Sequence, residues 1–272
     1  MIESDVSAIV LAAGTSSRMG RRNKLLALFQ NKPLVLHVVD QLAASRVGEI
    51  VVVLGHEAEK IFDVLSVHKK TLRPLVPKSP RTCSPLPSFP RRRESKKCAA
   101  SKDSRLRGND MHVGRSPGER VDSSRITTQD SASHKNIRFV KNPDFKSGMT
   151  SSIQAGVRAA RSEAEGFMIC QADMPLITTA EYDFLLTNFS RLLQKDDLAI
   201  QRPIFKGRVG NPVIFSKKYK DAILMHPSPE GCRGILKENA RHVHEIKMDS
   251  DHILQDIDTE EAFERITQNA SG

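Results

Sequence analysis

The residues from Ala8 to Lys24 read A-I-V-L-A-A-G-T-S-S-R-M-G-R-R-N-K, and this stretch decides the fold. Its first five residues are apolar, which is typical of a strand buried on both faces of a parallel sheet. Small and hydroxyl-bearing residues follow directly, together with Gly14 and Gly20. Open α/β folds bind ligands in such turns, because the turns lie at the carboxyl edge of the sheet. We therefore expect a ligand-binding loop after the first strand.

The expected loop has the chemistry of a phosphate site. Gly14 and Gly20 allow backbone N–H groups to approach phosphate oxygens, while Arg18 and Lys24 add positive charge. The loop is neither a Walker sequence, which needs Gly-Lys-Ser or Gly-Lys-Thr, nor a G-x-G-x-x-G fingerprint. The alternative is a surface turn with incidental charges. The arginines at positions 21 and 22 are either solvated or in contact with phosphate.

Strand-like and helix-like segments alternate along the rest of the chain. Strands are expected at residues 8–12, 50–54, 137–141, 166–171, 198–205 and 212–215, and helices at residues 33–44, 56–67, 150–161, 179–193, 216–225, 233–239 and from residue 259. Strands that alternate with helices form βαβ crossovers. The predicted fold class is therefore α/β and Rossmann-like, with a mainly parallel, mixed sheet and helices on both faces.

The middle of the chain differs from the rest. Residues 71–135 hold 15 Lys+Arg against 6 Asp+Glu, whereas the remainder of this chain of net charge +10 is nearly balanced. The segment from Arg73 to Arg125 is crowded with Pro, Ser and basic residues and has no helical or strand periodicity. Since such a long structureless loop is improbable inside a compact domain, we expect a single domain over residues 1–272, interrupted by a disordered insertion at about residues 73–130.

Two stretches of this segment point to its origin. They read P-S-F-P-R-R-R-E-S at residues 87–95 and D-S-R-L-R-G-N-D at residues 103–110. Both resemble the peptide encoded when an interspersed palindromic DNA repeat of bacterial genomes is read through. The alternative is a basic arm for nucleic acid, which is disfavoured because Phe89 alone supplies an aromatic side chain. We expect no nucleic-acid partner.

Several other classes of protein are disfavoured. The four cysteines form no C-x-x-C pair, which argues against a zinc site and a disulfide framework. The apolar runs, such as Ile50 to Leu54, are far too short to cross a bilayer. Residues 1–7 include Glu3 and Asp5 and lack the basic start and apolar core of a signal peptide. We expect a cytoplasmic protein without a membrane partner.

The sequence resembles a known family at several motifs in order. The pattern L-A-A-G-x-S-x-R-M-G followed by a lysine is similar to the signature of MobA-like NTP transferases, especially molybdenum cofactor cytidylyltransferases. The similarity continues in V-L-G-H at residues 53–56, in N-P at 142–143 through G-M at 148–149 with Ser151 and Ser152, in D-M-P at 173–175, in K-G-R-V-G-N-P at 206–212 and in D-I-D-T at 256–259. The resemblance spans nearly the whole chain except the insertion.

The resemblance implies a Rossmann-like nucleotidyltransferase fold and a Mg²⁺-dependent transfer of a nucleoside monophosphate from an NTP to a phosphate-bearing acceptor, with release of pyrophosphate. Ala12-Ala13-Gly14 stands where guanylyl-transferring relatives usually have Ala-Gly-Gly, which favours CTP. The implied acceptor is molybdopterin, and molybdoenzyme maturation proteins are implied partners. The family usually has Gly-Asp-x-Gly-Ala-Arg where this chain has S-P-E-G-C-R at residues 228–233, so the acceptor stays open.

The resemblance also implies site residues. The implied nucleotide-binding residues are Leu11, Ala12, Ala13, Gly14, Ser16, Arg18, Lys24, Gly148 and Ser152. Arg18, Lys24 and Asp173 are the implied catalytic residues, and the implied acceptor-binding residues are Gly210, Asn211 and Arg233. For Ser151 and Ser152, simple capping of the helix expected at residues 150–161 is the alternative.

The polyphosphate needs a cation, and Mg²⁺ binds through one or two carboxylates together with substrate phosphates. Asp173 follows the strand expected at residues 166–171 and therefore reaches the same sheet edge as the loop. The resemblance implies Asp258 as the second ligand, with Asp256 in a structural role. The alternatives are a plain turn carboxylate for Asp173 and a helix cap for Asp258 or Thr259. No general base is assigned, because a phosphate acceptor is already ionised.

Two other functions stay open. One is transfer to a sugar phosphate or another small acceptor. The other is a catalytically silent nucleotide-binding accessory protein, which the altered stretch at residues 228–233 would allow.

Deleting residues 78–128 should leave folding and activity largely intact, because the segment cannot contribute much to a core. Circular dichroism and NTP turnover of the deletion variant check this. A variant that is soluble and folded but inactive would contradict it.

Overall fold

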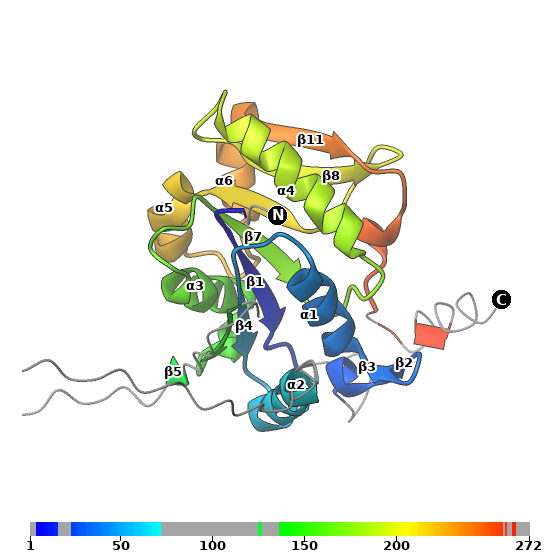
Figure 1. Ribbon diagram of the computed structural model, residues 1–272. Coiled ribbons are helices and arrows are strands. Elements are labelled where there is room, and N and C mark those ends of the chain that lie inside the picture. Colours follow the sequence, from blue (N-terminus) through cyan, green and yellow to red (C-terminus); the bar gives the residue numbers. More distant parts are fainter. Residues whose placement is uncertain are drawn as a thin grey trace, which may run out of the picture. The chain divides into compact units, whose positions relative to one another are not determined.

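The computed structural model in Figure 1 describes residues 4–15, 23–71, 125–126, 136–257, 259 and 263–264. The chain divides into two units, residues 1–71 with 122–272 and residues 72–121, and every described residue belongs to the first. Ser16, Arg18 and Asp258 lie outside the described residues, as do most of the helix expected from residue 259 and nearly all of the insertion expected at residues 73–130.

A nine-stranded mixed sheet forms the centre of the described fold. Its strands are β1 (Val6–Ala12), β4 (Glu49–Leu54), β5 (Arg125–Ile126), β6 (Ile137–Lys141), β7 (Gly166–Gln171), β8 (Ile200–Phe205), β9 (Arg208–Val209), β10 (Val213–Ser216) and β11 (Val243–Lys247). They run in the order β11-β8-β10-β7-β1-β4-β6-β5, with β9 paired to β8. The central strands β7, β1, β4 and β6 are parallel, β11 is parallel to β8, and β10 is antiparallel to both neighbours. A separate hairpin joins β2 (Leu28–Phe29) and β3 (Lys32–Pro33).

Helices cover both faces of the sheet (Figure 1). Side chains of α1 (Leu34–Ala44), α2 (Ala58–Thr71) and α4 (Thr179–Leu193) share one hydrophobic cluster with the sheet. Those of α3 (Met149–Ala159), α5 (Lys220–Met225) and α6 (Arg233–Glu238) share the other. Alternate residues of the central strands β1, β4 and β7 enter the two clusters, as the two-residue period of a strand requires. The expected α/β fold is confirmed.

The central strands carry the sequence pattern of buried parallel strands. Every residue of β4 is buried, and β1 is buried except at Leu11. Strands covered by helices on both faces have this composition, because neither side meets water. None of the helices in the described ranges combines the length and apolar composition needed to cross a bilayer.

Several expected elements differ from those observed. The helix expected at residues 216–225 consists of a 3-10 turn, η4 (Lys217–Tyr219), followed by the short α5. The strand β11 was not expected. Arg125 and Ile126, which fall in the segment expected to lack structure, form β5 and pair with β6.

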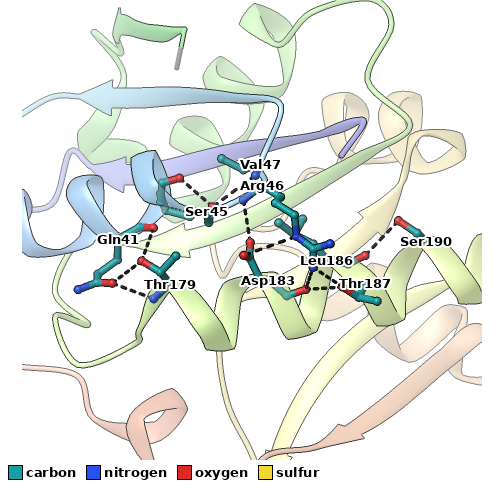
Figure 2. Close-up of polar contacts among 10 residues, drawn as sticks. Gln41, Ser45, Arg46, Val47, Thr179, Asp183, Leu186, Thr187 and Ser190 are labelled. Atoms are coloured by element: carbon teal, nitrogen blue, oxygen red, sulfur yellow. Dashed lines mark hydrogen bonds and ion pairs between the residues drawn. The ribbon is translucent and has the colours of Figure 1, made fainter. Parts of the chain in front are cut away.

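Polar contacts between α1 and α4 fix these neighbouring helices (Figure 2). The amide of Arg46 donates to Asp183 Oδ1 at 2.7 Å, and its guanidinium donates to Thr187 Oγ1 at 2.5 Å. At the start of α4, Thr179 donates through its amide and its hydroxyl to Gln41 Oε1, at 2.8 and 2.6 Å. These bonds hold the two helices over β1 and β7, the strands that end at the candidate site.

The first turn of α4 also holds the C-terminal part of the chain. Thr178 caps the helix, with reciprocal bonds between its hydroxyl and the Glu181 amide and between its amide and the Glu181 carboxylate. The same carboxylate accepts bonds from the Ser250 hydroxyl and lies 3.1 Å from His252 Nδ1. Burial raises the pKa of Glu181, but the bonds from Ser250, Thr178 and His252 outweigh this effect, and the pKa lies below its ordinary value.

The variant Glu181→Gln should lower the free energy of unfolding at pH 7 by about 1 kcal/mol, because the amide keeps the acceptor of the capping box but loses the charge that strengthens the bonds from Ser250, Thr178 and His252. A carboxylate with a lowered folded-state pKa stabilises the fold above pH 4.5, and this stabilisation is lost as the pH falls through the folded-state value. The difference from the unmodified chain should therefore shrink in acid. Urea unfolding at pH 7 and pH 3 measures it, with the exposed Glu238→Gln as control. A difference that does not depend on pH would contradict this account.

Candidate active site

The strands β1, β4 and β7 end at the same edge of the sheet and bring three loops together. Register pairs Leu11 of β1 with Gln171 of β7 and Ala12 with Leu54 of β4. After β1 the described chain continues through Thr15 and resumes at Asn23, whose side chain caps the 3-10 turn η2 (Lys24–Leu26). The predicted phosphate loop therefore begins and ends at this edge.

Lys24 and Asp173 meet there, although 149 residues separate them in sequence. Lys24 Nζ lies 2.5 Å from Asp173 Oδ2, and each side chain is only 13% exposed. The structure thus brings together the predicted phosphate-binding cation and the predicted metal-binding carboxylate. Removing two such charges from water is costly, so the pair is weak evidence for stability by itself.

The C-terminal segment returns to the same place. The amide of Ile257 donates to the carbonyl oxygen of Asp173 at 3.1 Å, and the Ile257 side chain is fully buried. This side chain packs with Phe29 and Leu34 below η2. The residue that precedes Asp258 is therefore held beside Asp173, whereas Asp256 is exposed. Asp258 itself lies outside the described residues, and its role as a metal ligand stays a prediction.

The start of α3 forms a second side of the site. Asn142 follows β6 and donates through its side chain to Ser151 Oγ at 2.9 Å and Ser152 Oγ at 3.0 Å. Gly148, at a φ of 115°, precedes the helix and adopts a backbone conformation that favours glycine. Ser152 is buried, and its hydroxyl accepts a hydrogen bond from Asn142. This bond agrees with two roles for Ser152: holding the start of α3 in place, and the predicted contact with the nucleotide. The role of Asn142 was not predicted.

A tight crossing joins the loops after β1 and β4. The amide of His56 donates to the carbonyl oxygen of Ala13 at 3.3 Å. A Cβ added to Gly55 would lie 2.7 Å from both Ala13 Cβ and Phe145 Cβ. Only a glycine therefore fits at this position without displacing the loop that follows β1.

The predicted acceptor residues line one pocket of about 810 Å³. Its lining residues are Leu11, Met149, Ile153, Ile169, Gln171, Arg202, Val209, Gly210, Asn211, Val213, Phe215, Glu230, Gly231, Cys232, Arg233, Leu236, Lys237, Ala240, Val243 and Glu245. Gly210, Asn211 and Arg233 thus share a pocket with Leu11 of the predicted nucleotide set. Arg202, Lys237 and Glu245 were not predicted.

The altered stretch at residues 228–233 borders this pocket and is tied to α3. Thr150 Oγ1 accepts a bond from the Gly231 amide at 2.9 Å and donates to the Ser228 carbonyl oxygen. Cys232 faces the pocket, and burial raises the pKa of its thiol to about 12. The thiol is therefore neutral at physiological pH and serves as an apolar lining residue.

The donor set at the edge fits a hard divalent cation. No group of three or more His, Cys, Asp or Glu side chains suited to a metal occurs among the residues that the structure describes. Mg²⁺ and similar cations need only one or two protein carboxylates when substrate phosphates supply the other oxygens. Asp173 offers such a carboxylate beside the phosphate loop.

The fold and this edge define a nucleotide-binding α/β protein. The sequence profile of the MobA-like NTP transferase domain matches residues 8–89 and 119–244, and the chain belongs to this family. Residues 90–118 lie outside the match, so an insertion splits the domain.

Local similarity extends to curated proteins. The chain is 43% identical to the bifunctional protein GlmU of Listeria monocytogenes over 60 residues, which are 22% of this chain and 13% of GlmU. The chain thus matches only a small part of the length of these relatives.

Solved structures share the whole fold. Rv0371c from Mycobacterium tuberculosis has a TM-score of 0.62 at 14% identity, covering 98% of this chain and 100% of that one. Rv0371c was also solved in complex with manganese, where the TM-score is 0.57 at 14% identity, with 97% and 98% covered. A nucleotidyl transferase from Methanothermobacter thermautotroptrophicus has a TM-score of 0.63 at 16% identity, with 97% and 96% covered. The 4-diphosphocytidyl-2C-methyl-D-erythritol synthase of Anaerococcus prevotii has a TM-score of 0.58 at 12% identity, with 98% and 96% covered.

Gly55→Ala should destabilise the chain by about 1–3 kcal/mol, because the new methyl group overpacks the crossing with Ala13. Gly14→Ala is the matched change in the neighbouring loop, where no described atom lies within 4 Å of an added Cβ. It should leave the melting temperature unchanged and reduce the stabilisation by a bound NTP. Thermal unfolding with and without the nucleotide measures both effects. Equal melting temperatures for the two variants would contradict the packing account.

Proposed function

We propose that this chain is a divalent-metal-dependent nucleotidyltransferase that transfers CMP from CTP to the phosphate of molybdopterin and releases pyrophosphate. The observation that carries the proposal is the 2.5 Å ion pair of Lys24 and Asp173 at the carboxyl edge of the sheet. The pair supports the proposal because an ammonium group suited to phosphate and a carboxylate suited to a metal lie in contact. Membership of the MobA-like NTP transferase family supports the same chemistry.

In the proposed reaction, an ionised oxygen of the acceptor phosphate attacks the α-phosphorus of CTP. A new P–O bond forms, the bond to the β-phosphate oxygen breaks, and the electron pair leaves with pyrophosphate. No proton has to be removed from the acceptor, which agrees with the absence of an assigned general base. The chemistry needs positioning and neutralisation of charge.

Each proposed catalytic residue has one task. Lys24 holds phosphate oxygens and stabilises the negative charge that develops on the leaving pyrophosphate. Asp173 would hold the divalent cation, with Asp258 as the proposed second ligand, and this cation would supply the positive charge that screens the repulsion between the two phosphates. Arg18 adds a further positive charge to the loop. When the nucleotide and its metal bind, Lys24 would pair with phosphate oxygens and Asp173 with the metal ion. These contacts can replace the ion pair between the two side chains.

The choice of CTP rests on Ala13, which precedes Gly14 where guanylyl-transferring relatives usually have a glycine. The A. prevotii synthase, whose name contains a diphosphocytidyl compound, shares the fold of this chain. A sugar phosphate is the second candidate acceptor, because the match to GlmU covers 60 residues of this chain at 43% identity. The product with molybdopterin would pass to molybdoenzyme maturation proteins.

Lys24→Ala and Asp173→Asn should each lower turnover on the order of 100-fold or more, the usual effect of removing one electrostatic contact to a developing charge. Release of pyrophosphate from each of the four NTPs, with molybdopterin or with a sugar phosphate, measures the activity. Lys217→Ala is the matched control, because it also removes a lysine from an ion pair, here with Glu165 at 2.7 Å. Glu165 precedes β7, at the end of the strand opposite to the proposed site. Rates near that of the unmodified chain in both site variants would eliminate the mechanism.

A further inference from the structure

The pocket extends well beyond the edge where the phosphate loop lies. Its floor is the sheet face that carries α3 and α6, with Ile169 of β7, Val213 and Phe215 of β10 and Val243 of β11. Met149 and Leu236 form parts of its apolar walls. The middle of the pocket therefore suits an apolar, ring-bearing body.

The strand order gives the pocket its length. It begins at Leu11 of β1 and Gln171 of β7 and ends at Arg202 of β8 and Glu245 of β11. From β1 the sheet passes through β7 and β10 to β8, and then to β11. Neighbouring strands lie about 4.8 Å apart, so the pocket spans about 14 Å to β8 and about 19 Å to β11. A hexose phosphate is too short to reach from one end to the other.

Charged side chains also line the pocket, and one of them has no charged partner among the described residues. Arg202 Nη2 lies 2.5 Å from Glu245 Oε1 across the pair of strands. Lys237 lines the pocket one turn of α6 beyond Arg233, on the same side of the helix. Arg233 lies 4.0 Å from Glu230, whereas Lys237 makes no ion pair or hydrogen bond with any residue in the described ranges.

We propose that Lys237, together with the Arg202–Glu245 pair, forms a specificity subsite for the end of the acceptor that is remote from its phosphate. The proposal rests on the proposed function and names the class of acceptor. That class is a phosphate monoester with an apolar ring-bearing body at least about 14 Å long, the span of three strand spacings. Its far end carries an oxygen that accepts from Lys237 and an N–H group that donates to Glu245. Lys237 is a binding residue here and takes no part in the transfer.

Flavin mononucleotide is a stable fluorescent probe of this class, since it joins a phosphate to a ring system that bears carbonyl and N–H groups. Its binding is measured by fluorescence in the presence of Mg²⁺ and a non-hydrolysable CTP analogue. The unmodified chain should bind it more tightly than riboflavin, which lacks the phosphate, and glucose 1-phosphate should compete poorly. Molybdopterin should compete well.

Lys237→Gln should weaken binding of flavin mononucleotide about tenfold, as loss of one charge-assisted hydrogen bond implies. Lys220→Gln on α5, which does not line the pocket, is the matched control and should bind as the unmodified chain does. Glu245→Gln tests the same subsite and should also weaken binding of flavin mononucleotide. The affinity for the CTP analogue should be equal in all variants.

Equal affinity of Lys237→Gln and the unmodified chain for flavin mononucleotide would overturn the subsite. So would an unmodified chain that binds glucose 1-phosphate as tightly as the flavin, or that binds no flavin. Pyrophosphate release is scored separately with molybdopterin. If the chain binds flavin mononucleotide selectively but transfers no CMP, the subsite stands and the proposed function is removed. If it transfers CMP and Lys237→Gln does not change the KM for the acceptor, the proposed function stands and the subsite is removed.

Discussion

The contact between Lys24 and Asp173 depends on the adjacency of β1 and β7. These strands are parallel neighbours in register, so the loop after β1 and the turn after β7 leave the sheet side by side. The surrounding fold keeps both charged groups largely out of water at 2.5 Å. A buried pair is expensive to desolvate, and its presence at a sheet edge where ligands bind points to use of the charges rather than to stability. The helices α1 and α4, joined by the polar contacts in Figure 2, pack in one hydrophobic cluster with both strands.

The central fold could be predicted from the sequence because its signals are local. The segments of β6, β7 and α4 were predicted with their observed bounds. Strand β7 has a central apolar run, and α4 begins with a Thr-x-x-Glu capping pattern. The strand β11 was missed because V-H-E-I-K is half exposed and rich in polar residues, as suits an edge strand. The antiparallel insertion of β10 between β7 and β8 depends on long-range pairing that no local pattern encodes.

The candidate site also contains residues with a local sequence signal and residues without one. Lys24 and Asp173 were found because each follows a strand that the sequence marks clearly. Gly210, Asn211 and Arg233 came from the family resemblance, and the structure brings them into one pocket while leaving their roles as predictions. Arg202, Lys237 and Glu245 belong to no motif, and they line one pocket only because β8, β11 and α6 all border it in three dimensions. Ordinary charged residues on separate elements give no sequence signal.

The backbone bond from Ile257 to Asp173 has a consequence for synthesis of the protein. The carboxylate at the centre of the proposed site is translated long before the segment that packs against it. While the ribosome still covers residues beyond about position 250, the polypeptide already exposed contains the phosphate loop and both central strands but lacks this closing segment. The nascent chain therefore has an incomplete wall beside Asp173 until Ile257 has been made and can bond to it.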